Sequence, residues 1–284
     1  MLTLLLVLAQ DVEALKALGA EVSATRVAFK DCSKLGEAEY KMIGALKGLK
    51  SLTLYGGKKT LTDATLPLLA PLAETLEELN TEGTHITDAG LAGFAVFKNV
   101  KGMSFFHPSL DVKGFDGSGF VALKELPKLE RLTIAGTRFD DKGMAAVAQI
   151  TQLKDFRTWH THQSQAGNAF LEKLPSLRSL TLGQRLRRWD GSSNATSLDD
   201  GTLDLLSRLQ TLESLSLDEA KLSLEALLKL KALPKLKKLS LQRIDLSAED
   251  VEKLKAALPD VKVDFKPMTE DERKKLEVYL NPPK

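Results

Sequence analysis

The sequence predicts a curved, horseshoe-shaped α/β solenoid with a parallel sheet on the concave face and helices on the convex face. Two observations support this fold class. A short apolar pattern returns along most of the chain at a nearly constant spacing. Each copy also joins an alternating apolar pattern, typical of a half-buried strand, to a three-residue apolar spacing that is typical of a helix.

The strand half of the repeat has the form LxxLxL, with other apolar residues at some positions. Full copies start at Leu49, Leu76, Val100, Leu129, Leu153, Leu177, Leu212 and Leu236, and weaker terminal copies start at Ala24 and Val261. The distances between full copies are 27, 24, 29, 24, 24, 35 and 24 residues, so one unit has 24 residues and the longer spacings contain insertions. Because side chains alternate along a strand, we expect each copy to bury one face of a strand.

The second half of each repeat predicts a short helix with one apolar stripe. The residues of the stripe are three apart, as in Phe120, Leu123 and Leu126, Met144, Val147 and Ile150, Leu203, Leu206 and Leu209, and Leu227, Leu230 and Leu233. Motifs such as "ITDAGL" from Ile86 and "FDDKGM" from Phe139 put Thr or Asp at the expected N-cap, with a carboxylate in the first turn where the helix dipole favours it. Pro127, Pro175, Pro234 and Pro259 are expected to end helices just before the next strand.

The N-terminal segment, residues 1–19, has two interpretations. Its apolar run "LTLLLVL" is either an export signal or part of an N-terminal cap, in which a helix from Asp11 to Leu18 covers the first repeat. The run is too short to span a bilayer, which requires about 20 apolar residues. It slightly favours a secreted or periplasmic protein over a cytoplasmic one.

The solenoid itself is expected to cover residues 20–266, and residues 267–284 form a C-terminal capping helix and tail. Thr269 and Glu272 have the spacing of a capping box. We therefore expect a helix from this point to Leu280 that closes the end of the stack.

The recurring motif identifies a resemblance to a known family. The stretch "GTHITDAGL", residues 83–91, together with the LxxLxL copies, resembles leucine-rich repeat proteins of the ribonuclease-inhibitor-like class. It is especially similar to repeats that are abundant in bacterial, notably planctomycetal, proteins. The resemblance implies a non-enzymatic scaffold that binds another macromolecule.

Composition and motifs offer no support for catalysis, cofactors or nucleic-acid binding. The 40 basic and 38 acidic residues nearly balance, so no broad positive field would attract nucleic acid. No Gly-rich phosphate loop or GxSxG motif occurs, and Cys32 is the single cysteine. Pairs such as Asp140 and Asp141 recur as helix starts, and a residue type that recurs in every repeat belongs to the scaffold. We predict no enzyme, no catalytic residue and no cofactor.

The histidines of "FRTWHTHQSQAG", residues 156–167, are the strongest candidate metal ligands, but we predict no metal site. Alignment with "GTHITDAG" puts His162 at a variable turn position beside His160. Zinc needs a third protein ligand, and the nearest candidate, His107, lies two repeats away, or about 10 Å at the usual strand spacing. In the same stretch Gln163 and Asn168 replace the core residues Ile86 and Leu91 of the aligned repeat. These replacements predict a loop more mobile than its neighbours.

The edge of the sheet at which strands end, here called the strand-exit edge, is the predicted binding surface. The same repeat position, expected to be exposed, holds Tyr55, Phe106 and Trp159, and Phe106 and Trp159 are predicted to form one shallow apolar patch around Ala135. Both insertions, residues 107–111 and 183–197, also follow a strand. The predicted partner-binding residues are Tyr55, Phe106, His107, Trp159, His160, Arg185, Arg187, Arg188 and Trp189.

These observations favour a monomeric, non-enzymatic scaffold that binds an unidentified protein or peptide through the concave sheet and the strand-exit loops. Two alternatives remain open: a structural or cell-surface repeat protein without a dedicated binding site, and a protein that binds extracellular glycan by stacking sugars on the same aromatic residues.

Overall fold

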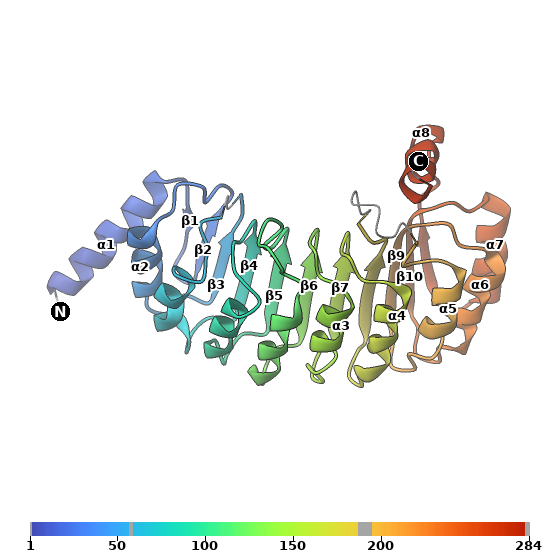
Figure 1. Cartoon of the computed structure of the whole chain (residues 1–284), viewed down its shortest axis with the longest axis horizontal. Coiled ribbons are helices and arrows are strands. Elements are labelled where there is room, and N and C mark those ends of the chain that lie inside the picture. The colour runs from blue at the N-terminus through green and yellow to red at the C-terminus, as the bar shows by residue number, and fades with distance from the viewer. Residues whose placement is uncertain (1, 57–58, 187–194, 282–284) are drawn as a thin grey trace. The chain divides into compact units, whose positions relative to one another are not determined.

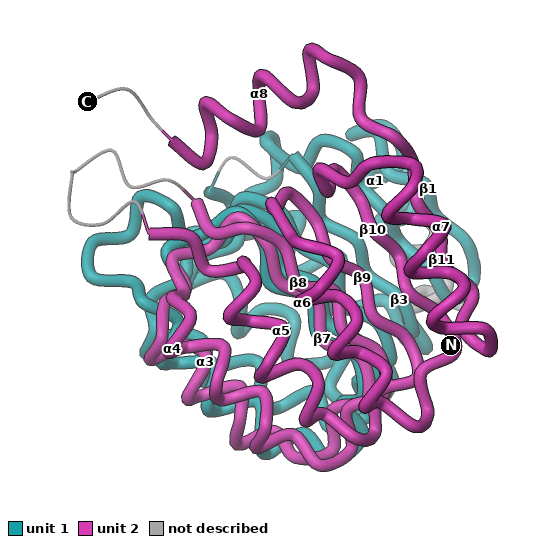
Figure 2. Tube along the Cα trace, turned by 90° about the vertical axis from the view of Figure 1, so that its right-hand side faces the viewer, with its two compact units in different colours: residues 1–138 teal, residues 139–284 magenta. Residues whose placement is uncertain are grey.

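The computed structural model describes residues 2–56, 59–186 and 195–281. The chain divides into two compact units, unit 1 with residues 1–138 and unit 2 with residues 139–284 (Figures 1 and 2). In each unit the strands lie side by side in the order of the sequence, and every strand is followed by a helical segment or a turn that leads to the next strand.

Unit 1 contains six strands and five helical segments among its described residues. The strands are β1 (Glu21–Val22), β2 (Arg26–Phe29), β3 (Ser51–Leu54), β4 (Glu78–Glu82), β5 (Gly102–Phe106) and β6 (Arg131–Ala135). The helices are α1 (Leu2–Ala17) and α2 (Glu37–Ala45), and the 3₁₀ helices are η1 (Leu66–Leu72), η2 (Gly90–Val96) and η3 (Ser118–Glu125). β1 pairs antiparallel with β2, and β2 to β6 are parallel.

In unit 2 the parallel strands are β7 (Asp155–Trp159), β8 (Ser179–Gly183), β9 (Ser214–Ala220), β10 (Lys238–Ile244) and β11 (Lys262–Phe265). The α-helices are α3 (Asp141–Val147), α4 (Gln165–Asn168), α5 (Asp200–Leu206), α6 (Leu224–Leu228), α7 (Ala248–Ala257) and α8 (Glu270–Leu280), and the 3₁₀ helices are η4 (Ala169–Lys173) and η5 (Lys229–Ala232). Both units thus confirm the predicted leucine-rich repeat solenoid fold.

The core of each unit is a stack of equivalent apolar residues. In unit 2, for example, Leu180 pairs with Leu215 and Leu215 pairs with Leu239 in register, and all three side chains are buried. The predicted helical stripes are buried throughout. Several of these segments are 3₁₀ rather than α-helical, because a helix with three residues per turn aligns residues spaced by three along one side.

The Asp residues of the predicted helix starts have a role that the sequence did not reveal. Asp63 accepts hydrogen bonds from the Thr87 backbone N–H (2.9 Å) and hydroxyl (2.6 Å) of the next repeat. Asp141 does the same for Ser164, at 2.7 and 2.6 Å. Asp88 likewise accepts hydrogen bonds from the backbone N–H groups of Asp116 and Gly119. Asp200 accepts one from the Ser223 backbone N–H. The recurring Asp therefore links neighbouring repeats, and Asp141 and Asp200 also lie in the first turn of a helix.

The described ends of the chain are both helical. α1 joins the predicted 11–18 helix and most of the apolar run into one helix, which contacts β1 and α2 and buries Leu15. α8 begins with the predicted capping box: the Thr269 N–H donates to Glu272 Oε2 (2.7 Å), and the Glu272 N–H donates to Thr269 Oγ1 (3.2 Å). Its main contacts are with β9 and β10, because the chain leaves β11 at the strand-exit edge and enters α8 within a few residues. None of the described helices has the length and apolar character needed to cross a membrane.

Candidate functional site

The backbone turns through a left-handed conformation at the strand-exit edge of most repeats. The residue concerned directly follows the predicted aromatic position and is here called the exit residue. Its φ is +63° at Gly56, +69° at Gly83, +48° at His107, +67° at Gly136, +51° at His160, +58° at Glu219 and +49° at Arg243. Glycine adopts this conformation freely, whereas other residues are disfavoured there by roughly 1–2 kcal/mol. Four of the exit residues therefore carry a charged or imidazole side chain in a backbone conformation that favours glycine: His107, His160, Glu219 and Arg243.

In unit 1, Tyr55 and Phe106 form the aromatic part of the edge. Their side chains are half-buried, and their ring centroids lie 6.0 Å apart at an interplanar angle of 86°, an edge-to-face contact. Glu82 of the intervening strand lies beside them: its Oε2 accepts from the Gly56 N–H (3.2 Å), and its Oε1 lies 3.3 Å from Nδ1 of the exposed His107. Burial and the nearby Glu82 charge raise the pKa of Tyr55, so the phenol stays protonated at neutral pH.

In unit 2, Trp159 is half-buried and rests against the neighbouring strand. Gly183 of β8 makes room for it, because a Cβ atom at position 183 would lie 2.5 Å from the Trp159 Cβ. Trp159 and Phe106 belong to different units, so their predicted common patch around Ala135 stays a prediction. At the strand-exit edge of unit 1, Phe106 is paired with Tyr55.

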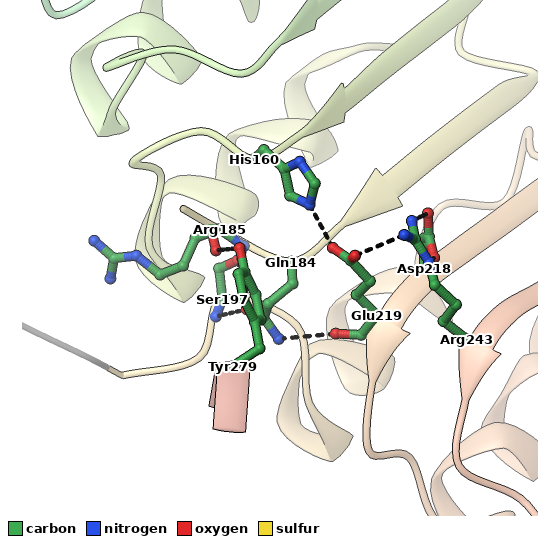
Figure 3. Close-up of polar contacts among 8 residues, drawn as sticks. All are labelled: His160, Gln184, Arg185, Ser197, Asp218, Glu219, Arg243 and Tyr279. Atoms are coloured by element: carbon green, nitrogen blue, oxygen red, sulfur yellow. Dashed lines mark hydrogen bonds and ion pairs between the residues drawn. The ribbon is translucent and has the colours of Figure 1, made fainter. Parts of the chain in front are cut away.

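Three exit residues and one neighbour of unit 2 form an ionic row along the edge (Figure 3). His160 Nε2 lies 2.5 Å from Glu219 Oε2, and Arg243 contacts Glu219 Oε1 at 2.8 Å and Asp218 Oδ1 at 2.8 Å. Burial opposes ionisation of Glu219, but the hydrogen bond from His160 and the charges of His160 and Arg243 outweigh it and lower the pKa of this carboxyl. Glu219 is thus an anion held between His160 and Arg243, with its side chain only 16% exposed.

The two replacements in the core, Gln163 and Asn168, are paired rather than loosely packed. Thr158 and Thr161 donate to Gln163 Oε1 at 3.1 and 2.9 Å, Gln163 Nε2 donates to Asn168 Oδ1 at 2.9 Å, and Asn168 Nδ2 donates to the Ser197 carbonyl at 2.6 Å. Both amide side chains are at most 1% exposed. The polar residues expected to loosen the loop form a buried hydrogen-bonded network.

This network continues through Gln184, the exit residue of β8. Gln184 turns inward and is 2% exposed. Its Oε1 accepts from the Ser197 N–H (2.8 Å), and its Nε2 donates to the Leu198 carbonyl (3.0 Å). The two ends of the long insertion are therefore fastened to the core beneath the ionic row.

Arg185 also helps to hold the long insertion against the core. Its side chain is 8% exposed, and the guanidinium donates to the carbonyls of Ala195 (3.3 Å) and His162 (3.1 Å). The Tyr279 hydroxyl of α8 donates to the Arg185 carbonyl (2.5 Å). Arg185 is consequently less available to a partner than the sequence suggested, and the predicted residues Arg187, Arg188 and Trp189 lie outside the described residues.

Glu219, Arg243 and Tyr279 are candidate site residues that the sequence reasoning missed. A signal for the first two exists, because the exit position holds glycine in some of the aligned repeats and a charged or imidazole residue in others. Nothing local to Tyr279 places it beside Arg185. Within the described ranges, no group of three or more His, Cys, Asp or Glu side chains is arranged to hold a metal ion.

Comparison with known proteins finds likenesses in structure. No family model and no curated protein matches the sequence. Among solved structures, an internalin (inlF) from Listeria monocytogenes aligns over 80% of this chain and 64% of its own, with 17% identity and a TM-score of 0.48. Internalin C2 (inlC2) from the same organism aligns over 82% of this chain and 84% of its own, with 18% identity and a TM-score of 0.49. The chain therefore spans less than two thirds of the first of these two proteins.

Proposed function

We propose that this leucine-rich repeat protein is a non-enzymatic scaffold that binds a protein or peptide along the strand-exit edge of its sheet. The observation that carries the proposal is the set of non-glycine exit residues, His107 in unit 1 and His160, Glu219 and Arg243 in unit 2. Backbone strain that persists at a surface position is typical of functional sites.

Ion pairing alone does not offset this strain at the exposed positions. The pair between His107 and Glu82 has side chains 56% and 37% exposed, and exposed pairs contribute about 0–1 kcal/mol. A left-handed non-glycine residue costs roughly 1–2 kcal/mol. A glycine at position 107 would therefore be at least as stable, which favours a role for the imidazole in contact with another molecule.

The half-buried aromatic residues supply the apolar part of such a surface. Tyr55 and Phe106 combine an apolar ring pair with the carboxylate of Glu82 and the imidazole of His107. Aromatic residues surrounded by polar groups are the commonest energetic centres of protein interfaces. Trp159, with His160 directly after it, offers the same combination in unit 2.

The proposal includes the subclass to which the leucine-rich repeats belong. The motif of residues 83–91 and the α-helices α3, α5 and α7 between strands support a ribonuclease-inhibitor-like scaffold related to the planctomycetal repeats.

The proposal is tested by selecting peptides from a displayed library on the immobilised full chain and titrating the enriched peptide against variants. We expect Phe106→Ala or Trp159→Ala to weaken binding about tenfold or more, as a lost aromatic anchor does, with an unchanged circular dichroism spectrum. The matched control is Val96→Ala, which removes an exposed apolar side chain from η2 and should not affect binding.

Equal loss in Val96→Ala and in both aromatic variants would contradict a site at the strand-exit edge. A glycan array probed with the same chain distinguishes the peptide-binding scaffold from the alternative, a glycan-binding protein. Glycan binding that Phe106→Ala abolishes, with no enriched peptide, would replace the peptide scaffold by a glycan-binding protein.

A further inference from the structure

α8 already occupies part of the strand-exit edge of unit 2 (Figure 1). It contacts β9 and β10, and polar contacts hold it there. The Tyr279 hydroxyl donates to the Arg185 carbonyl at 2.5 Å, Glu277 pairs with Lys221, and Arg273 pairs with Asp245 at 3.0 Å. The edge therefore accommodates a helix, and the contacts of α8 show which groups it recognises.

Few apolar side chains hold α8 in place. Leu276 is its one buried residue, whereas α7 buries Val251 and Leu254 within the repeat stack. A hollow of about 290 Å³ remains beside α8, lined by Glu219, Arg243, Met268, Glu272, Lys275, Leu276 and Tyr279. Besides Leu276, the half-buried Tyr279 contacts the edge, with its ring centroid 6.1 Å from that of His160. A helix with one buried leucine, one half-buried tyrosine, two exposed ion pairs and an incompletely filled interface gains little from docking.

The helix itself is specified by local contacts. Its capping box joins Thr269 and Glu272, and the Asn281 side chain donates to Glu277 at the other end. These contacts lie within α8 and do not depend on β9 or β10. α8 can thus leave the edge without losing the interactions that favour its helical form.

We infer that the strand-exit edge of β8, β9 and β10 is a helix-binding surface and that α8 is its displaceable intramolecular occupant. The partner it fits is an amphipathic helix with a leucine and a tyrosine three residues apart, as Leu276 and Tyr279 are. An acidic residue directly after the leucine meets Lys221, and a basic residue three positions before it meets Asp245. This inference rests on the proposed function, because it names the kind of partner that the edge of unit 2 accepts.

Hydrogen exchange of the full chain measures whether α8 opens independently. We expect α8 amide groups to exchange at least about 100-fold faster than those of α7, through local opening. The variant Tyr279→Phe, which removes one hydrogen bond, should accelerate α8 exchange about fivefold and leave α7 unchanged. Lys274→Ala is the matched control, because Lys274 lies on the same helix with 70% of its side chain exposed and pairs with Glu270 of that helix, and it should leave α7 exchange unchanged and α8 exchange within about twofold.

A fluorescent synthetic peptide of residues 267–281 tests the surface. Because opening of α8 exposes the site, Leu276→Ala in the full chain should bind the peptide about tenfold more tightly than the original chain does. Lys221→Glu in that background should weaken binding about tenfold, and a peptide with Glu277→Lys should restore it. If Leu276→Ala fails to fold, Tyr279→Phe serves as the opened background.

Two results would overturn the inference: α8 exchange that occurs only with global unfolding, or peptide binding that the opened variants do not increase. Neither result depends on Phe106 or Trp159. Failure of the library selection with a positive peptide titration would therefore remove the proposed function and leave the helix-binding surface in place.

Discussion

The buried amide network gives the sharpest test of how unit 2 is stabilised. The substitution Asn168→Leu restores the residue type that Leu91 represents in the aligned repeat. It removes the Asn168 bonds to Gln163 Nε2 and to the Ser197 carbonyl, at 2.9 and 2.6 Å. The Ser197 carbonyl keeps the Thr202 hydroxyl as a donor (3.2 Å), whereas Gln163 Nε2 loses the acceptor that Asn168 provides.

The magnitude follows from these contacts. A buried donor left without its acceptor costs about 1–3 kcal/mol, and the gain from the more apolar side chain offsets part of this. We expect Asn168→Leu to lower the free energy of unfolding by about 2 kcal/mol. Adding Gln163→Ile removes the stranded amide, so the double variant should lose about 1 kcal/mol less than the sum of the two single changes.

Urea unfolding followed by circular dichroism measures each free energy. The mirror control is Leu91→Asn, which buries an amide in a repeat where Ile86 is the neighbouring core residue, and it should destabilise the chain by about 2–4 kcal/mol. The reasoning fails if Asn168→Leu is as stable as the original chain, or if the effects of Asn168→Leu and Gln163→Ile simply add.

Two further predictions concern the edges of the sheet. Hydrogen bonds from Lys101 and Lys50 lower the pKa of Glu77 from its ordinary value of 4.5 to about 2. The ionised Glu77 carboxylate therefore stabilises the fold fully above about pH 4.5, and this contribution is lost as the pH falls toward 2. Glu77→Gln should flatten the decline in unfolding free energy over this range. An unchanged decline would contradict the pairing of Glu77 with Lys101 and Lys50. Gly183→Ala places a methyl group against the Trp159 Cβ and should destabilise the chain by about 1–3 kcal/mol, with a shift in tryptophan fluorescence; a neutral Gly183→Ala would mean that Trp159 moves freely.

The parts of the fold that could be predicted from the sequence are those with a local or periodic signal. The capping box of Thr269 and Glu272 lies within four residues, and the Leu203, Leu206 and Leu209 stripe repeats at fixed spacing. The buried network has neither kind of signal, because Asn168 and Ser197 are distant in sequence and meet only through the stacking of repeats. The same holds for Tyr279 and Arg185, since helix signals specify α8 but not where it docks.

The inner network and the outer ionic row of unit 2 meet at Gln184. Because this exit residue turns inward, β8 adds no exit side chain at the surface between His160 and Glu219. These two residues belong to strands two apart, which are separated by about 10 Å. An imidazole and a carboxylate can span that distance from opposite sides, and their contact at 2.5 Å does so (Figure 3).

The inward orientation of the Gln184 side chain is stabilised by the Ser197 N–H, which donates a hydrogen bond to it. The carbonyl of Ser197 accepts a hydrogen bond from the Asn168 side chain. A chain with leucine at position 168 and glycine at position 160 would lack the hydrogen bond from Asn168 to Ser197 and the contact between His160 and Glu219. The polar replacements in the core are therefore joined to the exit residues through Ser197 and Gln184, whose backbone carbonyl accepts a hydrogen bond from the His160 N–H at 2.8 Å.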